Sequence, residues 1–127
     1  MAGTLVANQI NTDTGLFSTN NAYTGIAKAW LNYNGSTQTV NGSFNVSSVT
    51  RNGSGDYTIT FTNAMANIYY VVSGSCQQTI TGNYGFVLDF PFNQAPTTTT
   101  ARFCTSNAGS GATTQDFPYV SVVVHGA

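Results

Sequence analysis

The sequence contains very little charge. Its 127 residues include three basic groups, four aspartates and no glutamate, so charged residues make up 6% of the chain, against roughly a quarter in ordinary globular domains. With a formal net charge of −1, the chain has no basic surface to neutralise phosphates or anionic lipid, and we expect neither nucleic acid nor a membrane as a partner. The exterior must be hydrated by Thr, Asn and Ser side chains instead.

Long apolar runs and a leader are also missing. The longest apolar run covers residues 68–72, far short of the roughly 20 residues that a membrane helix needs. The N-terminal residues, MAGTLVANQINT, have neither the basic nor the apolar region of a secretory signal. We therefore expect a protein made soluble in a cytoplasm. No window places apolar residues at helical spacing over three turns, which argues against amphipathic helices.

The groups that catalysis requires are scarce. A nucleophile would have to be Cys76 or Cys104, with His125 as the base, yet neither cysteine lies in an activating motif and the histidine is close to the C-terminus. Glycoside hydrolysis needs paired carboxylic residues, which a chain without glutamate hardly supplies. We expect no enzyme. Both cysteines are predicted to be small buried hydrophobes, and a disulfide between them stays open because their even number permits one.

Residues 52–56, NGSGD, superficially resemble part of an oxygen-ligand loop for Ca²⁺. The segment supplies a single carboxylate, so we interpret it as a turn and expect no metal and no cofactor.

The most informative segment is residues 43–62, SFNVSSVTRNGSGDYTITFT. Its apolar residues alternate with Ser, Asn and Thr, which is the period of a strand with one buried and one wet face. Residues 52–56 supply the positive-φ positions that a hairpin loop needs. The sequence predicts a hairpin with an uncharged wet face. The apolar residues on its buried face are expected to be Phe44, Val46, Tyr57, Ile59 and Phe61.

A period close to two continues through the rest of the chain, and turn signals separate the strands every 8 to 15 residues. This spacing is typical of an antiparallel sandwich or barrel. We predict an all-β fold: an antiparallel β-sandwich or partly closed barrel over residues 26–127, preceded by an extended N-terminal arm over residues 1–25. The further strands are expected at residues 27–33, 68–75, 84–90, 99–105 and 119–125.

Aromatic side chains are the main candidates for contacts with a ligand or another subunit. Exposed aromatic rings beside Asn, Asp and Thr can stack on sugars while the polar groups bind hydroxyls. Tyr23, Tyr84 and Phe92 adjoin loops and are least explained by a core, whereas Trp30 is expected in the core or against a subunit partner. The candidates for surface or subunit contacts are Leu5, Val6, Ile10, Phe17, Tyr23, Trp30, Tyr84 and Phe92.

Residues 26–65 resemble a module of tailed-bacteriophage virion proteins, in which a strand of the type AKAWVNFNG precedes SFNVSSI, a Gly-rich turn and DYTVNFT. Here residues 27–30 (AKAW) and the Asn34-Gly35 pair match the first part, and residues 43–49 and 56–58 match the second. The lead-in TLVANQINTDTG is similar to the short segment that precedes this module in phage structural proteins, and the closing YVSVVVHG resembles the last strand of the module more loosely.

This resemblance implies a non-enzymatic phage virion protein, a homotrimer at the virion exterior that is assembled in the host cytoplasm. A short arm followed by one sandwich-sized domain is the build expected of a capsid decoration (cement) protein that stabilises the head, with the major capsid protein as its partner. The alternative is a tail-fibre tip or receptor-binding protein, which would contact tail proteins and recognise a host-surface glycan.

Overall fold

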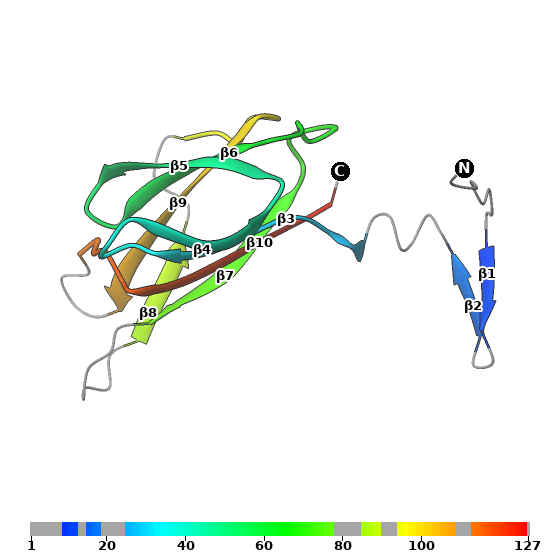
Figure 1. Cartoon of the computed structure of the whole chain (residues 1–127), viewed down its shortest axis with the longest axis horizontal. Helices are drawn as coiled ribbons and strands as arrows, with labels where there is room; N and C mark the ends of the chain where they lie inside the picture. Colours follow the sequence, from blue (N-terminus) through cyan, green and yellow to red (C-terminus); the bar gives the residue numbers. More distant parts are fainter. Residues whose placement is uncertain are drawn as a thin grey trace.

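The computed structural model describes residues 9–12, 15–18, 25–77, 85–89, 94–108 and 113–126. Two antiparallel four-stranded sheets pack face to face as a β-sandwich, which confirms the predicted fold class (Figure 1). The first sheet, in the order β4-β3-β10-β7, contains β3 (Ala27–Asn34), β4 (Thr39–Phe44), β7 (Val71–Gln77) and β10 (Tyr119–His125). The second, in the order β5-β6-β9-β8, contains β5 (Val46–Gly53), β6 (Asp56–Phe61), β8 (Gly85–Asp89) and β9 (Thr100–Ala108).

Within the arm, β1 (Gln9–Thr12) and β2 (Gly15–Ser18) pair antiparallel and form a separate two-stranded sheet. The sequence analysis expected an extended arm and did not anticipate this hairpin. Its register aligns Ile10 with Phe17. Leu5, Val6 and Tyr23, the other candidates in this region, lie outside the described residues.

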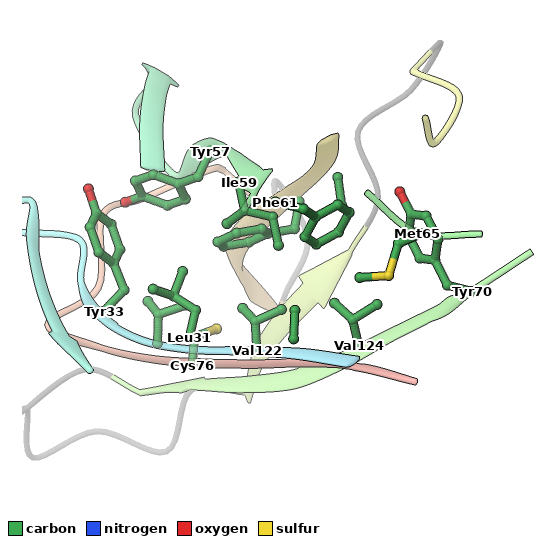
Figure 2. Close-up of a cluster of buried hydrophobic side chains, with 14 of the residues drawn as sticks. Leu31, Tyr33, Tyr57, Ile59, Phe61, Met65, Tyr70, Cys76, Val122 and Val124 are labelled. Carbon is green, nitrogen blue, oxygen red and sulfur yellow. The ribbon is translucent and has the colours of Figure 1, made fainter. Parts of the chain in front are cut away.

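The core lies between the two sheets and draws side chains from both (Figure 2). Towards one end, Tyr33 packs edge-on against Tyr57 with their ring centroids 5.2 Å apart. Towards the other end, Phe61 packs edge-on against Tyr70 at 5.7 Å. Such pairs stabilise a core beyond the area that they bury. The other buried apolar residues are Ala29, Leu31, Ile59, Met65, Cys76, Ala101, Phe103, Phe117, Val120, Val122 and Val124.

The predicted strand at residues 27–33 is confirmed as β3, but the expectation that Trp30 lies in the core is wrong. Side chains of a strand alternate between its two faces. Ala29 and Leu31 are buried against the second sheet, so Trp30 between them points to the outer face, where it remains 43% exposed. The other expectation for Trp30, a seam between subunits, remains a prediction.

The predicted hairpin is confirmed as β5 and β6, joined by the two-residue turn Ser54-Gly55. Its first strand does not include Phe44. The chain passes from the first sheet to the second at Asn45, whose φ of 55° breaks the strand, so Phe44 belongs to β4 and is 54% exposed. The wet face is also not wholly uncharged, because Asp56 on it forms an ion pair with Arg102 of β9.

The other predicted strands are present, and all but the last have shifted ends. The segment predicted from residue 68 becomes a strand only at Val71, because residues 62–70 connect the second sheet to the first. In this connection Tyr70 is buried and its hydroxyl donates to the carbonyls of Thr97 and Thr100 at 3.0 and 2.9 Å. The last predicted strand coincides with β10.

Candidate functional site

Polar groups converge on Asp116, at the end of the sandwich where the β5–β6 turn meets the segment before β10. Its carboxylate accepts a short hydrogen bond from the Tyr57 hydroxyl and another from the Gly55 N–H at 2.8 Å. Arg51 donates to the same carboxylate through Nε at 3.0 Å and Nη2 at 2.7 Å. A single aspartate therefore joins two elements that lie far apart in the sequence.

The backbone around Asp116 supports this connection. Thr105 is fully buried, and its Oγ1 donates to the Gln115 carbonyl at 2.7 Å while its N–H donates to the Gly55 carbonyl at 2.8 Å. On the other side, the N–H of Gly35 donates to the Phe117 carbonyl at 2.8 Å. The segment before β10 is thus bonded to the β3–β4 turn, to the β5–β6 turn and to β9.

Electrostatics around Asp116 stabilise its ionised form. Burial alone would raise the pKa of this carboxyl, but hydrogen bonds from Arg51, Tyr57 and the Gly55 N–H outweigh burial and hold the pKa below its usual value. Burial, together with the negative charge of Asp116, raises the pKa of the Tyr57 hydroxyl. The phenol stays protonated and acts as a permanent donor. Because both carboxylate oxygens, the Tyr57 hydroxyl and Nε and Nη2 of Arg51 are bonded to other protein groups, we interpret the network as structural.

The two cysteines and the histidine lie on three different strands. Cys76 is buried on the inner face of β7, Cys104 is half-buried on β9 of the other sheet, and the two form no disulfide. Burial raises the pKa of the Cys76 thiol to about 11, so it is not the reactive thiolate at neutral pH. His125 lies on β10 of the first sheet. In the described part of the chain, no three His, Cys, Asp or Glu residues are grouped closely enough to hold a metal ion.

The outer face of the first sheet has a different character. The register places Phe44, Trp30, Val123 and Ser73 in one row across β4, β3, β10 and β7. The indole of Trp30 leans over Gly42 on β4: a Cβ at this glycine would lie 3.3 Å from Cζ3 of the ring. A side chain at this position would push the ring outward by a few tenths of an ångström, so Gly42 lets the indole lie close along the sheet.

Polar side chains fill the next row of this face. Asn32 of β3 is aligned with Gly42 and with Ser121 of β10, which in turn is aligned with Ser75 of β7. The Nδ2 of Asn41 donates to Oδ1 of Asn32 at 2.9 Å, and Nδ2 of Asn32 donates to the Ser121 hydroxyl at 3.4 Å. These side chains form a short amide and hydroxyl chain across three strands.

Beyond the polar row lies a third one. Tyr119 on β10 is 56% exposed and is aligned with Gln77 of β7. We name the set of Trp30, Phe44, Asn32, Asn41, Ser121 and Tyr119 the outer-sheet site.

Exposed apolar residues also gather at the end of the sandwich where the arm joins β3. Ile26 is 60% exposed, Tyr69 82% and Val71 62%. Ile26 directly precedes β3, and Val71 is the first residue of β7. His125 of β10 is aligned with Val71 on one side and with Ala27 on the other, so Val71 and Ile26 lie at the same end of the sheet. We name Ile26, Ile68, Tyr69 and Val71 the arm-side surface.

The candidates from the sequence are therefore distributed unevenly. The structure places Trp30 in the outer-sheet site, and Ile10 and Phe17 in the arm hairpin, while Tyr84 and Phe92 lie outside the described residues. Sequence reasoning missed Phe44 and Asn32 beside Trp30 and Tyr119 on the same face of the sheet, and it missed the role of Asp116. One signal was available: Trp30 and Asn32 are two positions apart on β3, so both lie on its solvent-exposed face.

Comparisons with models of protein families, with curated proteins and with solved structures found no match to this chain. Among the described residues, no helix is both long and apolar enough to cross a membrane.

Proposed function

We propose that this chain is a non-enzymatic structural protein of a bacteriophage virion, a trimeric capsid decoration protein that stabilises the head. The observation that carries the proposal is the arm-side surface, where large apolar side chains are exposed beside the point at which the arm joins the sandwich. Soluble monomers rarely expose contiguous apolar patches, and such patches mark contacts with other proteins. A neighbouring subunit or the major capsid protein would bury this one.

The position of the phage-like segment in the fold supports the proposal. Residues 26–65 contain β3 and β4 at one edge of the first sheet and β5 and β6 at one edge of the second, connected at Asn45. The motif residues therefore build one complete side of the sandwich, as expected if the resemblance reflects a common structural unit.

The geometry of the polar groups supports a structural rather than a catalytic role. Asp116 and Asp56 are both engaged with arginines, and Asp116 is also bonded to a tyrosine and a backbone amide. Their lowered pKa values keep them as carboxylates, which suits ion pairing and does not suit a general acid at neutral pH.

The copy number in purified virions tests the proposal. Quantitative mass spectrometry of particles should give amounts of this chain comparable to those of the major capsid protein, and antibody labelling in electron micrographs should decorate heads. A handful of copies with labelling at the tail would contradict the decoration proposal and favour a tail-fibre tip. Absence from purified particles would contradict any virion role.

A further inference from the structure

We propose that the outer-sheet site binds a neutral carbohydrate chain, with Trp30 as the stacking surface and the Asn32, Asn41 and Ser121 side chains as hydrogen-bonding partners. This site differs from the arm-side surface on which the virion proposal rests, and it does not depend on that proposal. It is also formed by different residues from the loop aromatics that the sequence suggested for glycan contacts.

The first argument is the accessibility of Trp30. An aromatic ring that can stack on a sugar must lie along the surface and keep part of its area in water. The indole leans over Gly42 and remains 43% exposed, and the neighbouring Phe44 is 54% exposed in the same row. Together they offer an apolar strip at the edge of the sheet, suited to the C–H face of a pyranose ring.

The second argument is the order of the rows. In a protein interface, apolar side chains gather at the centre and polar ones at the rim. Here the order is reversed, because the polar row of Asn32 and Ser121 lies between the row of Trp30 and the row of Tyr119. A second protein bound to this face would bury the amides at the centre of the interface. A sugar instead presents hydroxyls between apolar faces, which matches the order of the rows.

The third argument is hydrogen-bonding capacity. An asparagine offers two N–H donors and two acceptor positions, and a serine offers one donor and two acceptors. The internal bonds from Asn41 to Asn32 and from Asn32 to Ser121 use only part of this capacity. They also orient the amides across the strands, so that the remaining donors and acceptors are held for a ligand that carries adjacent hydroxyls.

The fourth argument is charge. The described positions of the three rows carry aromatic, aliphatic, amide and hydroxyl side chains only. Lys28, two positions before Trp30 on the same face of β3, lies beyond the Trp30 row on the side away from Tyr119. The rows themselves therefore match a neutral ligand. Trp30 and Tyr119 are four residue positions apart along the strand direction, which is about 13 Å at the rise of a strand. A site of this length fits an oligosaccharide better than a single sugar.

The single tryptophan makes the test direct, because Trp30 is the only one in the chain. Purified full-length protein is titrated with cellohexaose, maltohexaose and mannohexaose while its tryptophan emission is recorded. Affinity electrophoresis through gels containing β-glucan, dextran, mannan or heparin provides a second readout. We expect an emission change with at least one neutral hexaose and retardation by the corresponding polymer.

Variants locate the site. Trp30→Ala should weaken binding about tenfold or more, because it removes the largest apolar surface of the face. Asn32→Ala and Ser121→Ala should each weaken binding about three- to tenfold, the range for one hydrogen bond. Thr50→Ala is the control, since Thr50 is exposed on β5 of the other sheet, outside both the outer-sheet site and the arm-side surface, and its substitution should leave binding unchanged. Trp30→Ala should melt like the wild type, which separates lost binding from lost folding.

Several outcomes would overturn this proposal. They are binding by none of the neutral probes, retention by heparin alone, and undiminished binding by Trp30→Ala. If Trp30→Ala instead dissociates an oligomer in analytical ultracentrifugation and no glycan binds, the face is a subunit interface. None of these results changes the copy number in virions, so the two proposals fail independently.

Discussion

At the residue scale, the most consequential side chain is Asp116, which no sequence pattern marks. Its carboxylate accepts bonds from Arg51, Tyr57 and the Gly55 N–H. Asp56 is a natural comparison, because its carboxylate also binds an arginine, Arg102, with Nε donating at 2.8 Å. Asp56 takes its other side-chain bond from Asn52 and none from the buried tyrosine.

Asp116→Asn should therefore cost about 2 to 3 kcal/mol of unfolding free energy, because it leaves the Tyr57 hydroxyl and the arginine without their charged acceptor. Asp56→Asn should cost less, about 1 kcal/mol, since it weakens a part-buried ion pair but leaves no buried hydroxyl or backbone amide without its acceptor. Urea unfolding of the two variants measures both values. Equal costs would show that the tyrosine and the backbone amide add nothing to the Asp116 network.

The same carboxylates determine the response to acid. The pKa of Asp56 is lowered, chiefly by its hydrogen bond with Arg102, and that of Asp116 is also below its usual value. A lowered pKa in the folded state means that stability is fully present above the unfolded pKa of about 4 and is lost as the pH falls through the folded values. Unfolding free energies measured by urea should be level near neutrality and decline in acid. The unfolding free energy of the double variant Asp56→Asn/Asp116→Asn should fall less as the pH is lowered into the acid range. An unchanged fall would contradict the assignment of the acid response to these two carboxylates.

Two glycines flank Ser54. Alanine substitutions at the two positions distinguish the effect of turn geometry from the general effect of replacing glycine by alanine. Gly55 has φ of +64°, and a Cβ there would collide with backbone atoms of Thr105 and Gln115, whereas a Cβ at Gly53 meets nothing within 4 Å. Gly55→Ala should destabilise the protein by about 3 kcal/mol through backbone strain and overpacking. Gly53→Ala should change stability by less than about 1 kcal/mol. Thermal melting of both variants provides the comparison.

At the scale of elements, the decisive feature is the passage of the chain from β4 to β5 at Asn45. Its Nδ2 donates to the carbonyls of Lys28 and Asn63 at 3.0 and 3.1 Å, and its Oδ1 accepts from the Asn63 N–H at 2.7 Å. Its φ of 55° lies in the left-handed region that asparagine tolerates better than most residues. One side chain thus closes the corner between the two sheets.

Asn45→Gly and Asn45→Ala should separate the contribution of the side-chain hydrogen bonds from that of the backbone conformation. Glycine keeps the backbone conformation and loses the three hydrogen bonds, for about 2 kcal/mol, whereas alanine adds a left-handed penalty of about 1 kcal/mol. Urea unfolding should rank the proteins as wild type, Asn45→Gly and Asn45→Ala in falling stability. Equal stability of the two variants would show that φ at this corner carries no cost.

At the scale of the whole molecule, the exterior has few charges and two of its three cations are engaged in ion pairs, Arg51 with Asp116 and Arg102 with Asp56. If the chain attaches to a particle as we propose, such a surface favours apolar contacts and neutral hydrogen bonds over long-range electrostatics, and salt screens these contacts little.

Release from virions should therefore respond little to salt between dilute buffer and molar NaCl, as followed by sedimentation of particles and analysis of the supernatant. The double variant Ile26→Ser/Tyr69→Ser should reduce attachment, because it removes two exposed apolar side chains of the arm-side surface. Val40→Ser is the control, since it changes an exposed valine elsewhere. Stripping by salt, or full attachment of the double variant, would contradict an apolar contact at this end.

Deletion of residues 2–24 tests the arm. If the arm makes the contact with a neighbour, the remaining sandwich should melt cooperatively and fail to attach to particles. Attachment of the shortened chain would assign the contact to the sandwich alone.

The sequence by itself determined the fold class, most strand positions and the β5–β6 hairpin. These features follow from local rules: the period of two, β-branched and aromatic content, and a turn that contains glycines. The same period could have placed Trp30 on the wet face beside Asn32, because parity is also local. The expectation of a buried Trp30 followed the general hydrophobicity of the residue instead.

Only the tertiary structure decided the rest. The exchange of sheets at Asn45, which exposes Phe44, depends on hydrogen bonds to Lys28 and Asn63, the latter 18 positions further along the chain. Trp30 and Tyr119 lie on the same face of the first sheet because β3 pairs with β10, a strand far away in the sequence. Asp116 meets Tyr57 because the segment before β10 is bonded to β9 through Thr105 and Gln115, and β9 pairs with β6. Pairing between distant strands is set by the collective burial of one core, and no local pattern specifies it.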